Sequence, residues 1–200
     1  MHRAKHLDRR LAAIMSVDVV GYSRMMGLDE AGTLQRLNEI RAEVFEPLVG
    51  DYGGRIVKLI GDGALLEFGS CVDAVECGLA FQKDMDERNR KIDQSNQITF
   101  RVGINLGEVI VQGRDIYGDG VNIAARIEAI AEPGGVALSG AAWAQVEGKI
   151  VAVFEDCGAQ ELKNITHPVS VYRWPNDVEI APQKMVQAGT GLGLPDKPSV

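Results

Sequence analysis

Residues 56–68 read Ile56-Val57-Lys58-Leu59-Ile60-Gly61-Asp62-Gly63-Ala64-Leu65-Leu66-Glu67-Phe68. Two apolar runs of β-like composition meet here at a Gly-Asp-Gly turn, and Asp-Gly between such runs is among the strongest signals for a β-hairpin. The hairpin places Asp62 at its tip, where a carboxylate can hold a cation. The same residues also suit a bare turn that binds nothing, so this stretch alone leaves both interpretations open.

The composition fits one compact domain with a tail. The chain has 200 residues, of which 46% are hydrophobic and 24% charged, and single domains typically have roughly 100–150 residues. Its 28 acidic and 21 basic side chains give a net charge of −7. That balance argues against nucleic-acid binding driven by phosphate neutralisation, so a small anionic ligand would need a local basic pocket.

The cysteines and the hydropathy indicate a reduced, cytoplasmic setting. The three cysteines form neither a Cys-x-x-Cys pair nor an even disulfide framework, and the three histidines do not cluster with them. We therefore expect free thiols and no zinc site. No signal-peptide core follows the basic N-terminus, and no apolar run approaches the roughly 18 residues that span a bilayer. We expect no membrane span in this segment.

Before the hairpin, the pattern predicts a strand and then helices. Residues 11–18 form an apolar run that ends on Asp18, and Gly21 permits a sharp turn into a helix. Backbone N–H groups at such a turn can cradle a phosphate, although a plain helix cap has the same appearance. Apolar residues then recur every three or four positions over residues 29–49, which predicts an amphipathic helix over one sheet face.

After the hairpin, the pattern predicts a helix over residues 71–92, a strand over 98–104 that Gly107 bends into 108–112, and a Gly-rich loop that leads into a helix. Asn122 and Arg126 share one face of that helix, where polar side chains usually contact only solvent. A short strand over 136–138, a short helix over 141–146 and a hairpin of strands 150–154 and 169–174 follow. This order predicts an α+β fold, a ferredoxin-like sandwich whose mostly antiparallel sheet is covered by helices on one face.

Four segments then carry a resemblance. They are Val17-Asp18-Val19-Val20-Gly21-Tyr22-Ser23, Lys58-Leu59-Ile60-Gly61-Asp62-Gly63, Asp115-Ile116-Tyr117-Gly118-Asp119-Gly120-Val121-Asn122-Ile123-Ala124-Ala125-Arg126-Ile127-Glu128, and Glu161-Leu162-Lys163. In this order they resemble the class III nucleotidyl cyclase catalytic domain of the adenylate cyclase type. The resemblance covers residues 11–174 as the catalytic domain. Residues 1–10 are then a basic lead-in, and residues 175–200 a Pro/Gly-rich linker or tail that leads to a further, regulatory domain.

The resemblance implies a metal pair and a base-reading pair. Asp18 and Asp62 would hold two divalent cations per site, and hard oxygen ligands with open positions suit Mg²⁺ or Mn²⁺. Lys58 and Asp115 would read the base, because adenine presents an acceptor at N1 and a donor at N6. Guanine presents the reverse pattern, and a buried mismatch costs about 1–3 kcal/mol.

The resemblance also implies the remaining binding and catalytic residues. Asn122 would orient the ribose, Arg126 would stabilise charge on the α-phosphate, and Lys163 would bind the terminal phosphates. The turn Gly21-Tyr22-Ser23 would contribute to substrate binding. Tyr22-Ser23 stands where an aromatic-Thr pair is common in the family, a change that keeps the ring and the hydroxyl.

The expected function is conversion of ATP to cyclic AMP and pyrophosphate by two-metal-assisted attack of the ribose 3′-hydroxyl. In the family each site lies at a dimer interface, and this chain holds both halves, so the resemblance implies a homodimer with two equivalent sites. Two alternatives stay open. One is a guanylate cyclase, and the other is a catalytically silent nucleotide-binding homologue, which would have lost one of these residues.

Overall fold

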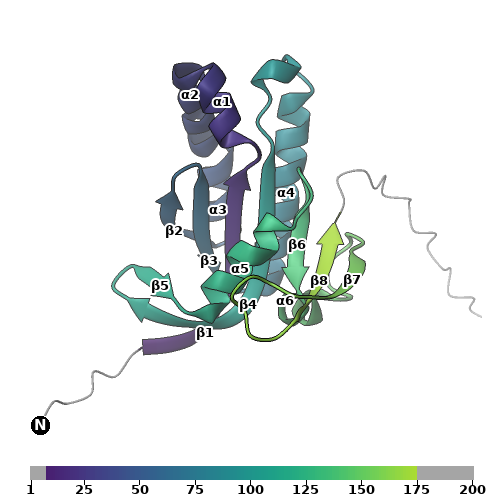
Figure 1. The fold of residues 1–200 in the computed structure, drawn as a ribbon. Coiled ribbons are helices and arrows are strands. Elements are labelled where there is room, and N and C mark those ends of the chain that lie inside the picture. Colours follow the sequence, from purple (N-terminus) through teal and green to yellow (C-terminus); the bar gives the residue numbers. More distant parts are fainter. Residues whose placement is uncertain (1–7, 175–200) are drawn as a thin grey trace, which may run out of the picture.

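The computed structural model describes residues 8–174, which form one mixed sheet with helices packed on it (Figure 1). The strands are β1 (Asp8–Val19), β2 (Arg55–Ile60), β3 (Gly63–Phe68), β4 (Phe100–Gln112), β5 (Asp115–Tyr117), β6 (Val136–Ser139), β7 (Glu155–Gln160) and β8 (Val169–Trp174). The helices are α1 (Tyr22–Leu28), α2 (Glu30–Ile40), the π-helical turn η1 (Arg41–Phe45), α3 (Glu46–Asp51), α4 (Cys71–Asn89), the 3₁₀ turn η2 (Gln94–Asn96), α5 (Asp119–Ala129) and α6 (Gly140–Val146). Residues 1–7 of the predicted lead-in (residues 1–10) and the predicted tail after Trp174 lie outside the described residues, whereas residues 8–10 of that lead-in belong to β1.

The sheet is mostly antiparallel, as predicted. Its strand order is β2-β3-β1-β4-β6-β8-β7, and β5 pairs with the far end of β4. Among the described strands, β4 and β6 make the one parallel pair. The long strands β1 and β4 pair along their whole length at the centre, with Asp18 directly opposite Arg101. The remaining strands of the sheet are added on either side of this central pair.

The predicted α+β class and the central hairpin are confirmed. Strands β2 and β3 pair antiparallel around a two-residue turn of Gly61 and Asp62. Gly61 has a φ of 60°, a left-handed conformation that favours glycine at this position. The predicted helix over residues 29–49 is present as α2, η1 and α3 in succession, and α3 ends two residues beyond the predicted boundary.

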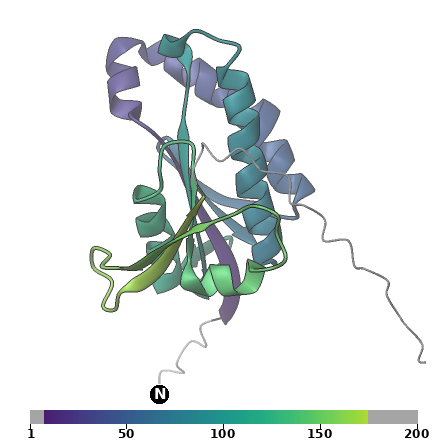
Figure 2. The same ribbon diagram turned by 90° about the vertical axis from the view of Figure 1, so that its right-hand side faces the viewer.

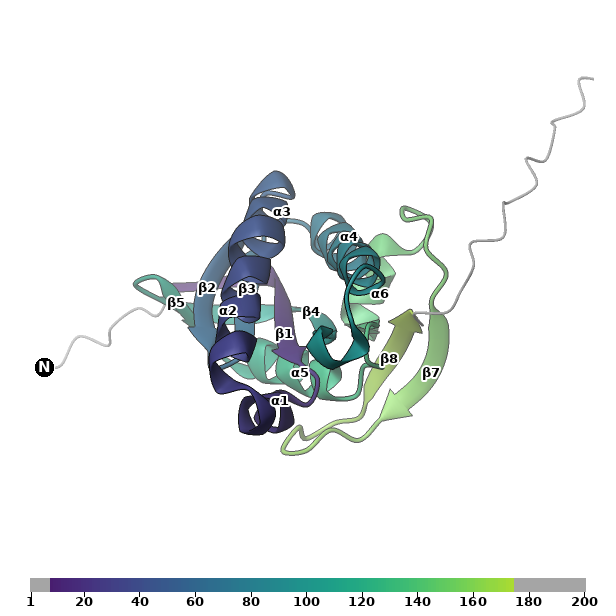
Figure 3. The ribbon, with the colours of Figure 1, turned by 90° about the horizontal axis from the view of Figure 1, so that it is seen from above.

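Helices cover both faces of the sheet, whereas the sequence pattern predicted one. The larger core lies between the sheet and helices α2 to α4 and α6, and includes Met15, Phe68, Phe81 and Ile104. Helix α5 packs on the opposite face against Ile14 and other residues of a smaller cluster. Figures 2 and 3 show α4 and α5 on opposite sides of the strands. A helix's apolar stripe does not reveal which face it covers, so sequence alone could not distinguish these arrangements.

Two strand predictions need correction. Residues 150–154 are not a strand; the partner of β8 is β7, which begins at Glu155. β7 is a largely exposed edge strand of polar composition, so it lacks the alternation that would have marked it. Phe154 is buried in the core without joining the sheet. Strand β5, predicted as part of a loop, is only three residues long and pairs with β4 around a turn at Gly113.

Candidate functional site

Asp18 and Asp62 meet at one end of the sheet. Asp18 lies one residue before the end of β1, and Asp62 lies in the β2–β3 turn. At Gly63 a Cβ atom would come within 2.5 Å of the Val17 carbonyl oxygen and 3.2 Å of Asp18 Oδ1, so the turn packs closely against the end of β1. Burial, and then repulsion from the neighbouring Asp62 carboxylate, raise the pKa of Asp18. Both carboxylates are half-buried.

Two charged residues that the sequence analysis did not select stand beside this acidic pair. Glu128 projects from α5, and burial followed by the charge of Asp18 raises its pKa to about 7, while Arg101 opposes the shift. The Nε atom of Arg101 is buried and has no hydrogen-bond partner among the described residues. Two signals could have indicated them: Glu128 ends the longest of the four motifs, and Arg101 interrupts an apolar strand.

Lys58 and Asp115 form an ion pair between β2 and β5. The Lys58 Nζ atom lies 2.9 Å from both carboxylate oxygens of Asp115, and the Ile116 N–H donates to Asp115 Oδ1 at 2.8 Å. The hydrogen bond from Lys58 is the main reason that the pKa of Asp115 is lowered. The Lys58 ammonium also lies 5.1 Å from the centre of the Tyr117 ring. The structure therefore brings together two residues that are far apart in the sequence.

Asn122, Arg126 and Lys163 lie on α5 and on the loop that follows β7. Asn122 is exposed and Arg126 half-buried, one helical turn apart. The Arg126 Nε–H donates to the backbone carbonyl of Lys163 at 3.2 Å, which joins the two segments. Lys163 itself is exposed. Asn122 and Arg126 thus give α5 a polar face, and the segment with the basic residue Lys163 is joined to it.

Gly21, Tyr22 and Ser23 form the turn from β1 into α1. Gly21 has a φ of 70° and directly precedes the helix. The N–H groups of Arg24 and Met25 donate to the Gly21 carbonyl. Because Tyr22 and Ser23 are the first residues of α1, their N–H groups find no acceptor within the helix. These donors lie a few residues after Asp18.

The acidic pair fits a divalent cation. Two half-buried carboxylates that repel each other are hard oxygen ligands, and a cation between them would relieve the repulsion. Among residues 8–174 no group of three or more His, Cys, Asp or Glu side chains is arranged to hold a metal. Phosphate oxygens and water would complete the coordination of an ion held by this pair.

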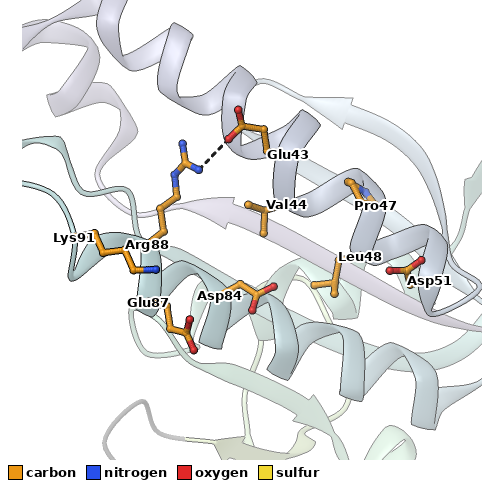
Figure 4. A pocket seen from close by; sticks show the side chains of 9 residues that line it. All are labelled: Glu43, Val44, Pro47, Leu48, Asp51, Asp84, Glu87, Arg88 and Lys91. Atoms are coloured by element: carbon orange, nitrogen blue, oxygen red, sulfur yellow. Dashed lines mark hydrogen bonds and ion pairs between the residues drawn. The ribbon is translucent and has the colours of Figure 1, made fainter.

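A separate groove lies between η1–α3 and α4, with a volume of about 480 Å³ (Figure 4). Arg88 spans it and pairs with Glu43 at 3.1 Å. None of the predicted site residues lines this groove. Its other lining residues include three more carboxylates, Asp51, Asp84 and Glu87. We therefore place the candidate site at the acidic pair, the Lys58–Asp115 pair and the polar face of α5.

Comparison with known proteins decides the family. The model of the adenylate and guanylate cyclase catalytic domain matches residues 7–172. The chain belongs to this family. It is 48% identical over 195 residues to "Putative adenylate cyclase 3" of Rhizobium meliloti, a match that covers 97% of this chain. The predicted family is thus confirmed, and a divalent metal is a general feature of this family.

Solved structures agree. An adenylate/guanylate cyclase/hydrolase from Silicibacter pomeroyi superposes with a TM-score of 0.79 at 39% identity, covering 86% of this chain and 99% of that one. The adenylyl cyclase CyaB of P. aeruginosa superposes with a TM-score of 0.73 at 24% identity, covering 88% and 98%, and shares the fold.

The chain is short beside its curated relatives. It spans 33% of the Rhizobium protein and 31% of an adenylate cyclase of Streptomyces coelicolor that is 34% identical over 127 residues, or 62% of this chain. Within the described part of the chain, no helix has the length and apolar character needed to cross a membrane. The activity of the whole protein is therefore a matter for proposal and experiment.

Proposed function

We propose that this domain is an adenylate cyclase that converts ATP to cyclic AMP and pyrophosphate. The observation that carries the proposal is the convergence of Asp18 and Asp62 at one end of the sheet, in a chain of the cyclase family. Because ATP is an intracellular substrate, we expect this activity in the cytoplasm. The further domain expected after the catalytic domain would then regulate it.

The reaction makes one bond and breaks another. The ribose 3′-oxygen attacks the α-phosphorus, the 3′-hydroxyl loses its proton, and the bond from the α-phosphorus to the bridging oxygen breaks, which releases pyrophosphate. Asp18 and Asp62 would hold two Mg²⁺ or Mn²⁺ ions, and bound ions of this kind activate the hydroxyl and neutralise the leaving group. The negative charge of the two carboxylates would attract cations to this part of the site.

The other site residues would bind and orient ATP. Asn122 donates to or accepts from the ribose, which holds the 3′-oxygen in line with the α-phosphorus. Arg126 stabilises the charge that develops on the α-phosphate, and its bond to the Lys163 carbonyl keeps it in place. Lys163 and the N–H groups of Tyr22 and Ser23 bind the phosphates, with Gly21 shaping the turn.

The Lys58–Asp115 pair supports adenine as the base. Lys58 has three N–H donors and Asp115 two acceptor oxygens, so each retains bonding capacity beyond their mutual contact. Lys58 would donate to adenine N1, and Asp115 would accept from N6. Replacing Lys58 with Glu and Asp115 with a small neutral residue should therefore lower ATP turnover strongly. Unchanged ATP turnover in this double variant, or equal use of ATP and GTP by the wild type, would mean that Lys58 and Asp115 do not read the base, and the assignment of ATP as the substrate would fail.

The proposed assembly is a homodimer with two equivalent sites at its interface. In this arrangement the metal pair comes from one chain, and the base-reading and α5 residues come from the other. Mixing an Asp62→Ala chain with an Arg126→Ala chain should then restore activity, because one of the two sites in each heterodimer is intact. If heterodimers form and no activity returns, the residues act within one chain.

The direct test is to incubate the purified protein with ATP or GTP and either Mg²⁺ or Mn²⁺, and to identify any cyclic nucleotide. The Asp18→Ala and Asp62→Ala variants should fold normally and lose cyclisation. An Asp93→Asn variant, which alters an exposed carboxylate in the loop after α4, serves as a matched control and should keep full activity. A wild-type protein that binds ATP but forms no cyclic nucleotide would be the silent homologue instead.

A further inference from the structure

Glu67 on β3 is a buried carboxylate held by two arginines. Its side chain is only 5% exposed, and a buried ionised carboxylate is costly unless it is paired. Arg10 of β1 lies 2.6 Å from Oε1, and Arg55 of β2 lies 2.5 Å from Oε2. These contacts lie on the same face of the sheet as α5, because Glu67 and Leu65 alternate with the residues that face the larger core. None of this cluster belongs to the site described above.

Arg55 also reaches the turn that carries Asp115. Its Nε and Nη2 atoms both bond to Glu67 Oε2, and its Nη1 atom donates to the backbone carbonyl of Arg114 at 2.9 Å. The guanidinium is planar and rigid, so these contacts fix its orientation. A buried carboxylate is thereby connected, through one side chain, to the residue directly before Asp115.

A β-bulge places Arg55 and Lys58 on the same face. Side chains three apart on a regular strand point to opposite faces. Here the pairing shifts between Ile56 and Lys58, so that Arg55 lies opposite Glu67 and Lys58 lies opposite Leu65. Those two partners are two residues apart and share a face. Two side chains of β2 therefore reach the β4–β5 turn from the same face. Lys58 pairs with Asp115, and Arg55 bonds to the backbone carbonyl of Arg114.

Apart from these contacts, strand β5 is held by its three-residue ladder with β4 and by the Ile116 side chain, which is buried in the smaller cluster. Gly113, next to Arg114, has a φ of 66°. The contacts of Arg55 and Lys58 thus secure the turn to β2. Both contacts lie within one residue of Asp115 or on Asp115 itself.

We propose that Arg55, anchored by Glu67, is a positioning residue that holds Asp115 in register with Lys58 for reading the base. This inference rests on the proposed function of the Lys58–Asp115 pair. A shift of about 1 Å in a positioned group can change rates by up to about a hundredfold. Loss of the Arg55 contact should therefore weaken nucleotide binding and base selection more than it weakens the fold.

Arg55→Lys tests the proposal, with Arg10→Lys as its matched control. Each variant keeps a cation beside Glu67 and removes one guanidinium, but only Arg55 contacts Arg114. We measure the affinities for non-reactive ATP and GTP analogues, the KM and kcat for ATP, the thermal midpoint, and hydrogen exchange of residues 112–117. Arg55→Lys should raise the ATP KM by about tenfold, reduce the preference for ATP over GTP, and speed exchange in the turn. Arg10→Lys should leave the affinities, the KM and the exchange near their wild-type values.

Equal effects of the two variants, or unchanged binding and exchange in Arg55→Lys, would overturn the proposal. A Lys58→Ala variant separates this failure from failure of the proposed function. If Lys58→Ala weakens ATP binding and base preference while Arg55→Lys does not, the positioning role is wrong. If neither variant changes binding or preference, the base-reading assignment itself is wrong, and the positioning proposal falls with it.

Discussion

Replacing Gly103 with alanine should push helix α5 away from the sheet. Gly103 lies in the middle of β4, directly beneath α5. A Cβ atom there would lie 2.2 Å from the Glu128 backbone nitrogen, 2.5 Å from its Cα, and 2.6 Å from the Ala124 carbonyl oxygen. All three neighbours are backbone atoms, so no side-chain rotation can relieve the contact.

The size of the displacement follows from these distances. Ordinary contact begins near 3.4 Å, so the helix or the strand must move by about 1 Å. Overpacking of this kind costs about 1–3 kcal/mol, and alanine returns about 0.4–1 kcal/mol by restricting the unfolded chain. The catalytic cost should be larger, because Asn122 and Arg126 move with the helix. Misplacement by about 1 Å can cost about a hundredfold in rate.

The assay pairs urea unfolding with measurement of cyclic AMP formation. Gly78→Ala is the matched control, because the nearest atoms to its added Cβ are side-chain methyl groups at 3.4 Å. Gly78 lies within α4, where alanine is favoured over glycine by about 1 kcal/mol, so this variant should be as stable as the wild type or more so. A Gly103→Ala protein with wild-type stability and wild-type turnover would refute the reasoning that the close contact at Gly103 fixes the position of α5 on β4.

Two further predictions concern buried titratable groups. The raised pKa of Glu128, about 7 against an ordinary value near 4.5, means that the folded protein loses stability as the pH rises from about 4.5 through 7. Urea unfolding of the wild type and of Glu128→Gln, in the presence of a metal chelator, tests this. The substitution should raise the free energy of unfolding by about 1–2 kcal/mol at pH 8, after allowance for solvent screening, and should change it little at pH 4.5. A substitution effect of the same size at both pH values would contradict the raised pKa. Burial raises the pKa of Cys71 to about 11 and that of Cys77 to about 12, so mass spectrometry should find a thiol reagent on Cys157 alone at pH 8, and on all three cysteines in denaturant.

Sequence patterns predicted those elements whose signals are local. The β2–β3 hairpin follows from its turn residues, and α4 follows from a sustained apolar period. Strand β7 could not be predicted in this way, because its residues are polar and its pairing depends on β8, which comes later in the chain. Strand β5 is too short to show any period. In each case a tertiary contact, and not the local pattern, determined the structure.

The site residues were predicted from a family resemblance. The contacts that these residues make with one another and with their neighbours could not be predicted from the motifs. The ion pair of Lys58 with Asp115 brings together two of the motifs. The opposition of Asp18 and Arg101 follows from strand register, and the shared face of Arg55 and Lys58 follows from a bulge. The pairing of β1 with the distant strand β4 and the position of a bulge are properties of paired strands, so the pattern of one strand does not predict them.

Strand β1 shows why the polar site and the main core can share one sheet. Its residues Ala13, Met15, Val17 and Val19 face the larger core, whereas Ala12 and Ile14 face α5. Continuing that alternation, Asp18 faces the α5 side, and so do its cross-strand partner Arg101 and, on β3, Glu67. On this side a single helix leaves room for charged groups, while the other side is filled by most of the helices. Substitutions that point toward the larger core should therefore act through stability, and so should those in the smaller apolar cluster beneath α5. Substitutions of the charged residues Asp18 and Arg101 on the α5 side should act first through nucleotide binding and turnover.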